Sequence, residues 1–161
     1  MTNDATSTQT SLSSLADWTM QHIRDVFEAP SSDLTVRALD STFSRSLKAT
    51  VNGTPVGFDG FSDLVASMQH TSPNGPKVDW IFADETPDDA GHRSGVVKGE
   101  YYIRGVFGKV PGSEAVVEFE THKQVVGRIE LQSPEAGVDS RRIVKLDAIV
   151  SVLPVDRSNT S

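Results

Sequence analysis

The sequence predicts an α+β domain in which three helices precede an antiparallel sheet. Apolar residues recur at helical spacing in three segments before residue 70, each preceded by a capping residue. Asn52-Gly53 lies between two short extended segments, which is the strongest short-range signal for a hairpin. From Lys77 onward, four long segments alternate apolar and polar residues. Helices that are separated along the chain from such strands indicate an α+β fold.

The first helix is predicted to begin near Ser14 and to end before Pro30. Ser14 and Asp17 have the spacing of a capping box, and the residue before a proline avoids helical dihedral angles. The apolar stripe of this helix consists of Leu15, Trp18, His22 and Val26. A second helix is expected after Ser32 or Asp33 as its cap, with an apolar side formed by Leu34, Ala38, Leu39 and Phe43.

The segment from Thr50 to Met68 predicts a tight hairpin that leads directly into a third helix. Asn52 and Gly53 are expected to adopt the positive φ angles that a two-residue hairpin turn requires. Asp59 is expected to cap the helix, whose apolar face consists of Phe61, Leu64, Val65 and Met68. Two prolines and an Asn-Gly pair within residues 71–76 end it.

Four strands are predicted after Lys77, and each has one apolar face. The expected sets are Val78, Trp80 and Phe82; Val97, Tyr101, Ile103 and Phe107; Val117, Phe119 and Thr121; and Val144, Leu146, Ala148, Val150 and Val152. The opposite face carries charges, as expected of an antiparallel sheet that helices cover on one side. The sequence leaves open the register of the last two strands around residues 128–144.

Length and composition limit the class of protein. The 161 residues fit one domain, expected at 12–154 between disordered polar tails at 1–11 and 155–161. The formal net charge of −7 and the scattered basic residues argue against binding to nucleic acid or to an anionic membrane. The chain has no cysteine, which excludes disulfides and thiolate chemistry. Without a secretory signal or an apolar run of about 20 residues, we expect a cytoplasmic protein that can enter the nucleus by diffusion.

This order of elements resembles the nuclear transport factor 2-like superfamily, also called the SnoaL-like or cone-shaped α+β barrel fold. The paired first helices, the stretch from Val51 to Met68, and the last strands at 117–131 and 141–150 carry the resemblance, which spans roughly Leu12 to Pro154. It implies three helices on a strongly curved, mainly antiparallel sheet, whose concave face lines an apolar pocket for a small organic molecule. The link between the last two strands is longer here than the compact turn common in that family.

The family includes isomerases, dehydratases, cyclases and non-catalytic binders, so the fold alone does not select a function. Acid–base chemistry in such a pocket requires a base with a shifted pKa and a donor that stabilises the developing oxyanion. Asp84 continues the apolar face of its strand and is a candidate base, unless it begins a solvated acidic loop. Tyr101, flanked by Gly99 and Gly105, is either a group that orients a carbonyl or a core tyrosine. His22 is either an acid or base in the cavity or a hydrogen-bonded residue at the edge of the core.

The candidate ligand-binding residues are Trp18, Phe43, Trp80, Phe119 and Lys123. Lys123 points inward if the alternation holds, whereas a bulge would turn His122 inward instead. The four histidines lie on separate elements without the spacing of metal ligands, so no metal site is predicted. Nucleotide-binding and hydrolase motifs are absent from the sequence, and we expect no cofactor.

Two functions remain open at the level of sequence. The first is a small-molecule pocket that catalyses cofactor-free isomerisation, dehydration or cyclisation. The second is a non-catalytic ligand-binding or protein-interaction module that forms a homodimer through the outer face of the sheet. A cavity on the order of a few hundred Å³ that holds a desolvated acid or base favours the first, whereas a cone filled by aromatic rings contradicts it.

Overall fold

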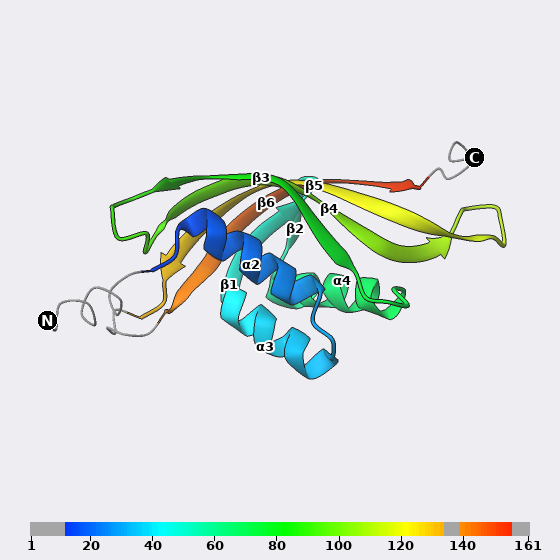
Figure 1. The fold of residues 1–161 in the computed structure, drawn as a ribbon, viewed down its shortest axis with the longest axis horizontal. Helices are drawn as coiled ribbons and strands as arrows, with labels where there is room; N and C mark the ends of the chain where they lie inside the picture. The colour runs from blue at the N-terminus through cyan, green and yellow to red at the C-terminus, as the bar shows by residue number, and fades with distance from the viewer. Residues whose placement is uncertain (1–11, 134–138, 156–161) are drawn as a thin grey trace, which may run out of the picture.

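Three helices lie on one side of a six-stranded sheet (Figure 1). The computed structural model describes residues 12–133 and 139–155. The predicted tail at 1–11 lies outside that part of the chain, as does the predicted tail at 155–161 apart from Val155. In chain order the elements are α2 (Leu15–Phe27), α3 (Ser32–Thr42), β1 (Phe43–Val51), β2 (Thr54–Val56), α4 (Phe58–His70), β3 (Lys77–Pro87), β4 (Gly95–Lys109), β5 (Val116–Leu131) and β6 (Arg141–Pro154). The predicted α+β class is confirmed.

The helix caps agree with the sequence for α2 and differ by a few residues for α3 and α4. The Ser14 side chain accepts a hydrogen bond from the Asp17 amide at 3.0 Å, as the capping box predicts. Ser31, not Ser32 or Asp33, caps α3. Its backbone is extended, and its Oγ accepts a hydrogen bond from the Leu34 amide at 3.2 Å. Gly57 precedes α4, and Asp59 lies inside the first turn, where its charge favours the helix dipole.

Phe43 is not part of the second helix, contrary to the prediction. The helix α3 ends at Thr42, and Phe43 begins β1, where it pairs with Ile143 of β6. This β1–β6 pair is parallel, and the other strand pairs of the sheet, in the order β2-β1-β6-β5-β4-β3, are antiparallel. The mainly antiparallel sheet is therefore as predicted.

The Asn52-Gly53 turn is as predicted and also fixes the hairpin to the rest of the sheet. Asn52 and Gly53 have φ angles of 51° and 83°. The Asn52 side chain donates to the Val150 carbonyl at 3.0 Å and accepts from the Val150 amide at 2.8 Å. The turn therefore binds β6 through the same side chain that tolerates the left-handed backbone.

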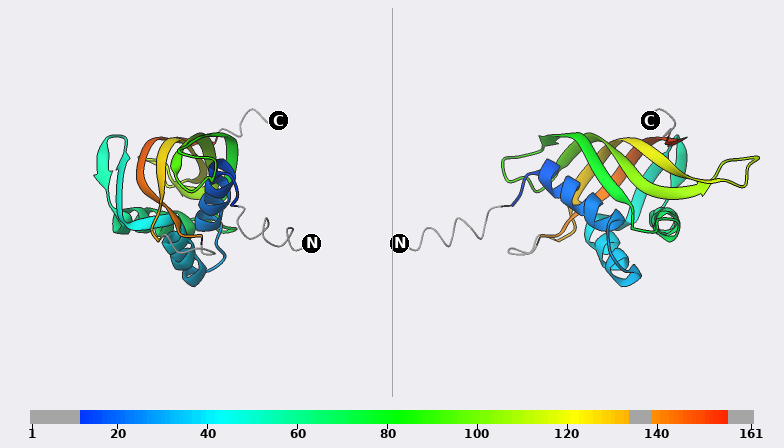
Figure 2. Two further views of the ribbon diagram at one scale, coloured as in Figure 1. Left: turned by 90° about the vertical axis from the view of Figure 1, so that its left-hand side faces the viewer. Right: turned by 45° about the vertical axis from the view of Figure 1, so that its right-hand side comes forward.

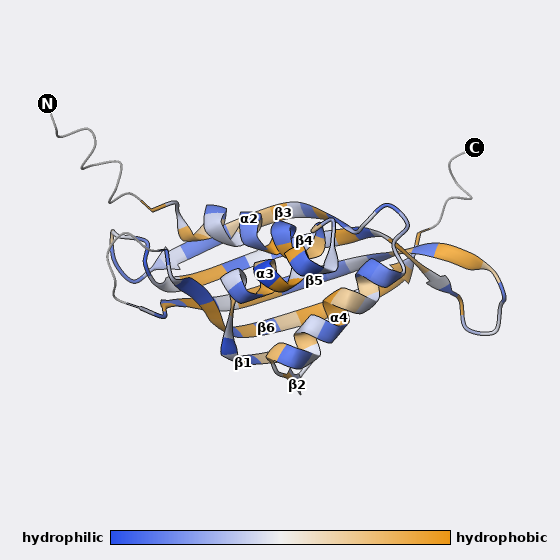
Figure 3. Cartoon of the chain, turned by 90° about the horizontal axis from the view of Figure 1, so that it is seen from below, coloured by the Kyte–Doolittle hydropathy of each residue, from blue (hydrophilic) through white to orange (hydrophobic). Residues whose placement is uncertain are grey.

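The sheet curls around the side on which the helices lie, and it is not closed (Figure 2). Its two edges are β2 and β3. Seen from the helix side, α2, α3 and α4 lie across the concave face, which we call the inner face (Figure 3). The core lies between these layers and includes Leu15, Val26, Phe27, Val65, Ile103, Ile129 and Ile143, all almost fully buried.

Register shifts decide which side chains reach the inner face. In β4, a shift between Ile103 and Val106 pairs Val106 with Phe119 and moves Phe107 off the predicted apolar face, opposite Glu118. Between Trp80 and Phe82 the pairing of β3 slips, so that Trp80 pairs with Tyr101 while Phe82 pairs with Glu100. Neighbouring residues of a strand point to opposite faces, so Phe82 lies on the outer face and not beside Trp80 as predicted.

A register shift between β5 and β6 fixes the pairing that the sequence left open. Lys145 pairs with Arg128, whereas Ile143 pairs with Ile129. Val144 is the extra residue of this bulge, and Ile143 takes the buried position that was predicted for Val144.

Candidate functional site

An enclosed apolar pocket of about 190 Å³ lies between α4 and the inner face of the sheet. Its helical wall consists of Phe27 from α2 and of Phe61, Leu64, Val65, Ser67 and Met68 from α4. Its sheet wall consists of Val51, Tyr101, Thr121, Lys123, Val125, Leu146, Ala148, Val150 and Val152. Among these described lining residues, Lys123 carries the single charge.

The pocket is reached from solvent between α4 and the end of β6. Leu64 on α4 is 48% exposed and Val152 on β6 is 53% exposed, although both line the pocket. The deep end is formed by Tyr101 and Lys123, whose side chains are buried. A small molecule that enters past Leu64 and Val152 therefore meets apolar walls before it meets these two polar groups.

Lys123 is a buried cation without a countercharge. Its residue is 9% exposed, and within the described part of the chain its ammonium makes neither a hydrogen bond nor an ion pair. Nζ lies instead 4.7 Å from the ring centroid of Phe27 and 5.6 Å from that of Phe61. Aromatic faces offset only part of the desolvation of an ammonium. Burial accordingly lowers the pKa of Lys123 to about 8.

Tyr101 is the direct cross-strand neighbour of Lys123. The two residues pair in the β4–β5 register, and Nζ lies 5.8 Å from the Tyr101 ring centroid. Burial raises the pKa of the Tyr101 hydroxyl above its ordinary value, so the group stays protonated and remains a donor. Among the described residues, no hydrogen-bond partner occupies this hydroxyl.

The glycines that flank Tyr101 do not create the space beside it. A Cβ at Gly99 would lie 2.8 Å from the Trp80 ring, and Trp80 packs against Tyr101 with ring centroids 4.5 Å apart and ring planes tilted by 45°. The missing side chain at Gly99 therefore leaves room for the Trp80 ring, which packs against Tyr101. Gly105 has a φ of 84° and lies at a bulge, where it permits the bend of β4.

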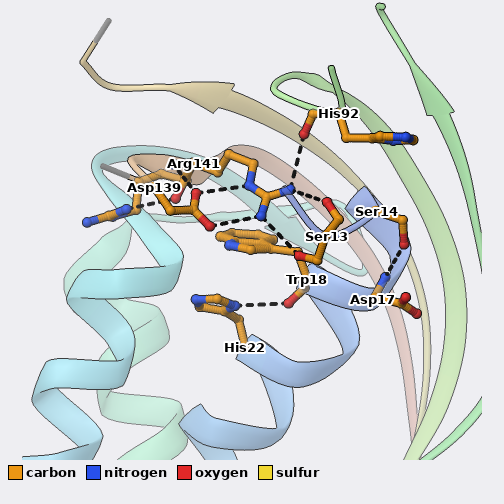
Figure 4. Close-up of polar contacts among 9 residues, drawn as sticks. Ser13, Ser14, Asp17, Trp18, His22, His92, Asp139 and Arg141 are labelled. Carbon is orange, nitrogen blue, oxygen red and sulfur yellow. Dashed lines mark hydrogen bonds and ion pairs between the residues drawn. The ribbon is translucent and has the colours of Figure 1, made fainter. Parts of the chain in front are cut away.

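His22 and Trp18 lie in a separate cluster outside the pocket (Figure 4). The His22 ring stacks on Trp18 at 4.2 Å, and its Nδ1 lies 3.0 Å from the Trp18 carbonyl oxygen. Burial lowers the pKa of His22. The residue borders an open hollow between α2 and α3 and does not line the Lys123 pocket.

The centre of that cluster is Arg141, which is 1% exposed. It donates to Asp139 at 2.8 Å, to the Ser13 carbonyl at 2.7 Å and to the His92 carbonyl at 3.1 Å (Figure 4). Its guanidinium carbon also lies 5.5 Å from the Trp18 ring centroid. These contacts tie the start of α2 to β6, so we interpret the cluster as structural.

Asp84 lies on the outer face of the sheet. The shift after Trp80 places Asp84 opposite Lys98, and its side chain is exposed. The expectation that Asp84 continues the inner face of its strand is therefore wrong, because the bulge reverses the alternation.

The predicted aromatic residues support the pocket from a distance. Phe43 packs on Phe61 with ring centroids 4.7 Å apart, and Trp80 packs on Tyr101. The Phe119 ring lies beside Gly108, farther along β5. None of the three appears among the described residues that line the pocket.

The rings that do contact the Lys123 ammonium are those of Phe27 and Phe61, and neither is among the candidate ligand-binding residues of the sequence. Their sequence signal was an apolar position on a helix, which does not distinguish a core ring from a ring that faces a cation. His122, the alternative to Lys123, points outward and pairs with Glu100 at 2.5 Å. Among the described residues, no group of three or more histidine, aspartate or glutamate side chains is arranged to hold a metal ion.

Three helices on the concave side of an open, curled sheet define the nuclear transport factor 2-like fold, which SnoaL-like proteins share. Three solved structures illustrate the likeness. A conserved protein from Planctomyces limnophilus has 13% identity and a TM-score of 0.53, covering 88% of this chain and 96% of its own. Mtr2 from Candida albicans has 15% identity and a TM-score of 0.53, covering 87% and 96%. AclR from Streptomyces galilaeus has 9% identity and a TM-score of 0.51, covering 84% and 90%.

At these identities the likeness establishes the fold and no function. No family model matches the sequence, and no curated protein sequence matches it either. Within the described residues, the helices are too short or too polar to cross a lipid bilayer.

Proposed function

We propose that the protein binds a compact, apolar carbonyl compound in the Lys123 pocket and transfers a proton within it without a cofactor. The observation that carries this proposal is the buried Lys123 ammonium, which has no countercharge among the described residues and pairs across the strands with Tyr101. A buried charge without a partner is costly for folding, so it is typical of sites that meet a ligand.

The two polar groups have complementary roles in this proposal. The neutral amine of Lys123 removes a proton from the carbon next to the carbonyl group. The Tyr101 hydroxyl donates a hydrogen bond to the carbonyl oxygen and stabilises the enolate that forms. Return of the proton at another carbon gives isomerisation, and loss of a leaving group from the neighbouring carbon gives dehydration.

The cavity volume favours a small substrate. About 190 Å³ is below the roughly 300–1,000 Å³ of pockets for drug-sized ligands, so steroids and large polyketides are poor candidates. Short or monocyclic ketones and aldehydes fit the volume and the apolar walls better.

Deuterium exchange tests the proposal directly. The protein is incubated with cyclohexanone in D₂O, and deuterium at the carbons next to the carbonyl is followed by NMR. We expect the exchange rate with the wild type to exceed the rates with Lys123→Met and with Tyr101→Phe by about 10²-fold or more. The rate is expected to rise up to about pH 8, where Lys123 becomes neutral. Equal rates for the wild type and Lys123→Met, together with no thermal stabilisation by small ketones, would refute the proposal.

We also propose that two copies of this chain associate through the outer face of the sheet. Phe82, Val126 and Ile149 are 38%, 43% and 63% exposed and border one apolar hollow of about 410 Å³ there. Lys98 and Asp147 border the same hollow, so a two-fold contact sets opposite charges against each other.

The assembly is tested by the mass in solution. Light scattering coupled to size exclusion is expected to give twice the chain mass for the wild type and the chain mass for Ile149→Lys. Val36→Lys, at a 54% exposed position of α3 away from the outer face, is the matched control. A wild type that remains at the chain mass at high concentration contradicts the homodimer. A functional wild-type monomer leaves the pocket proposal intact, since the pocket lies on the opposite face.

A further inference from the structure

We infer that Lys123 is a nucleophile that forms an imine with an apolar aldehyde or ketone held in its pocket. This inference rests on the proposed function, because the same pocket must admit a carbonyl compound. It adds a covalent step and restricts the ligand class to carbonyl compounds whose carbonyl carbon reaches Nζ.

The placement of Lys123 differs from that of every other lysine in the chain. The sequence has six lysines, and Lys123 is the buried one. The five exposed ones are Lys48, Lys77, Lys98, Lys109 and Lys145. Lys123 alone opens onto an enclosed apolar cavity, with Phe27 and Phe61 on one side and Tyr101 on the other.

The surroundings make the Lys123 amine available at neutral pH. Within the described residues no carboxylate pairs with its ammonium, and burial disfavours the charged form. At pH 7 about a tenth of a lysine population with a pKa of about 8 is neutral, compared with about 0.04% for an ordinary lysine. The lone pair needed for attack is therefore about 200-fold more abundant at Lys123 than in a lysine of ordinary pKa.

The step balances without a further reactant. The nitrogen lone pair forms the bond to the carbonyl carbon, and the π electrons move to the oxygen. The Tyr101 hydroxyl is placed to hydrogen-bond that oxygen, which takes up a proton while the nitrogen loses one, giving a carbinolamine. Loss of the hydroxyl group as water gives the imine, so one amine and one carbonyl yield one imine and one water. The apolar walls disfavour the return of water.

Reductive trapping tests the inference on the full chain. The protein is mixed with butanal and sodium cyanoborohydride at pH 7, and the modified lysines are identified by peptide mapping, in which alkylation of a lysine blocks tryptic cleavage after it. The five exposed lysines are internal references in the same sample. We expect Lys123 to be alkylated at least about tenfold faster than any of them.

Matched variants separate pocket chemistry from general lysine reactivity. Lys123→Arg keeps the positive charge but cannot form an imine, so the fast alkylation must disappear. Ala148→Leu fills part of the pocket and is expected to slow alkylation of Lys123 without changing the surface lysines. Lys145→Arg replaces an exposed lysine and is expected to leave the fast alkylation unchanged.

The outcomes distinguish this inference from the proposed function. Alkylation of Lys123 at or below the rate of the exposed lysines overturns the imine inference. If deuterium exchange of cyclohexanone still depends on Lys123 in that case, the lysine acts as a base alone and the proposed function stands. If exchange, thermal stabilisation and trapping all fail, both proposals are wrong.

Discussion

Replacement of Lys123 by methionine is expected to stabilise the folded protein while removing the chemistry of its pocket. Methionine has a similar length and no charge, so the variant keeps the packing against Phe27 and Phe61 and removes a desolvated ammonium. The replacement of a buried charge by an apolar residue of similar volume is commonly neutral or stabilising.

The magnitude follows from the pKa of Lys123. Its pKa falls from the ordinary value of 10.5 to about 8 in the folded protein, and each pKa unit corresponds to about 1.4 kcal/mol. The buried ammonium therefore lowers the free energy of unfolding by about 3 kcal/mol at neutral pH. For a chain of this size, such a difference corresponds to roughly 6–12 °C in Tm.

The pH dependence of the free energy of unfolding tests independently whether Lys123 destabilises the folded protein. Between about pH 8 and pH 10.5 the unfolded chain keeps the Lys123 proton, whereas the folded chain has lost it. Stability contributed by this group therefore rises with pH across that window, and the penalty is largest below about pH 8. The advantage of Lys123→Met over the wild type is thus expected to be about 3 kcal/mol at pH 7 and to shrink toward pH 10.

Urea unfolding of both proteins at several pH values measures this difference. Lys145→Met, which changes an exposed lysine of β6, is the matched control and is expected to change stability by less than about 0.5 kcal/mol at every pH. A Lys123→Met variant that is less stable than the wild type, or whose advantage does not change with pH, would refute the interpretation of Lys123 as a desolvated cation.

Two further substitutions test the structural interpretation of the remaining polar groups. Arg141→Met is expected to reduce the free energy of unfolding by about 3–5 kcal/mol, because it leaves Asp139 without its partner and two carbonyls without their donor. Urea unfolding measures this loss, and a loss below about 1 kcal/mol would contradict the buried network. Asn52→Ala is expected to cost about 2 kcal/mol, since it removes two hydrogen bonds to Val150 and places alanine at a φ of 51°, and an unchanged Tm would show that the turn does not fix the hairpin to β6.

Features that depend on neighbours along the chain could be predicted from the sequence. The Ser14 cap and the Asn52-Gly53 turn are local, because the groups that form them lie within three residues of each other. The first residue of α3 could not be predicted, because Ser31, Ser32 and Asp33 are all good caps and only the backbone angles select one of them.

Features that depend on strand pairing could not be predicted. A bulge is set by the contacts of the neighbouring strand, and the one after Trp80 moved Phe82 and Asp84 to the outer face. By contrast, β5 pairs without a shift from Thr121 to Arg128, so simple alternation placed Lys123 inward and His122 outward. The missing countercharge of Lys123 was beyond the sequence, because it depends on where carboxylates from other elements lie.

Two cationic side chains are buried within the described residues, and the contrast between them is the strongest reason to regard the Lys123 pocket as functional. Arg141 is 1% exposed, and the fold provides it with Asp139, two carbonyl oxygens and an aromatic face. Among the described residues, Lys123 contacts aromatic faces and no carboxylate. A structural cation is satisfied within the protein, as Arg141 is. A lysine that the protein leaves unpaired in an apolar pocket, at the expense of stability, is more simply explained by a carbonyl ligand on which its amine acts.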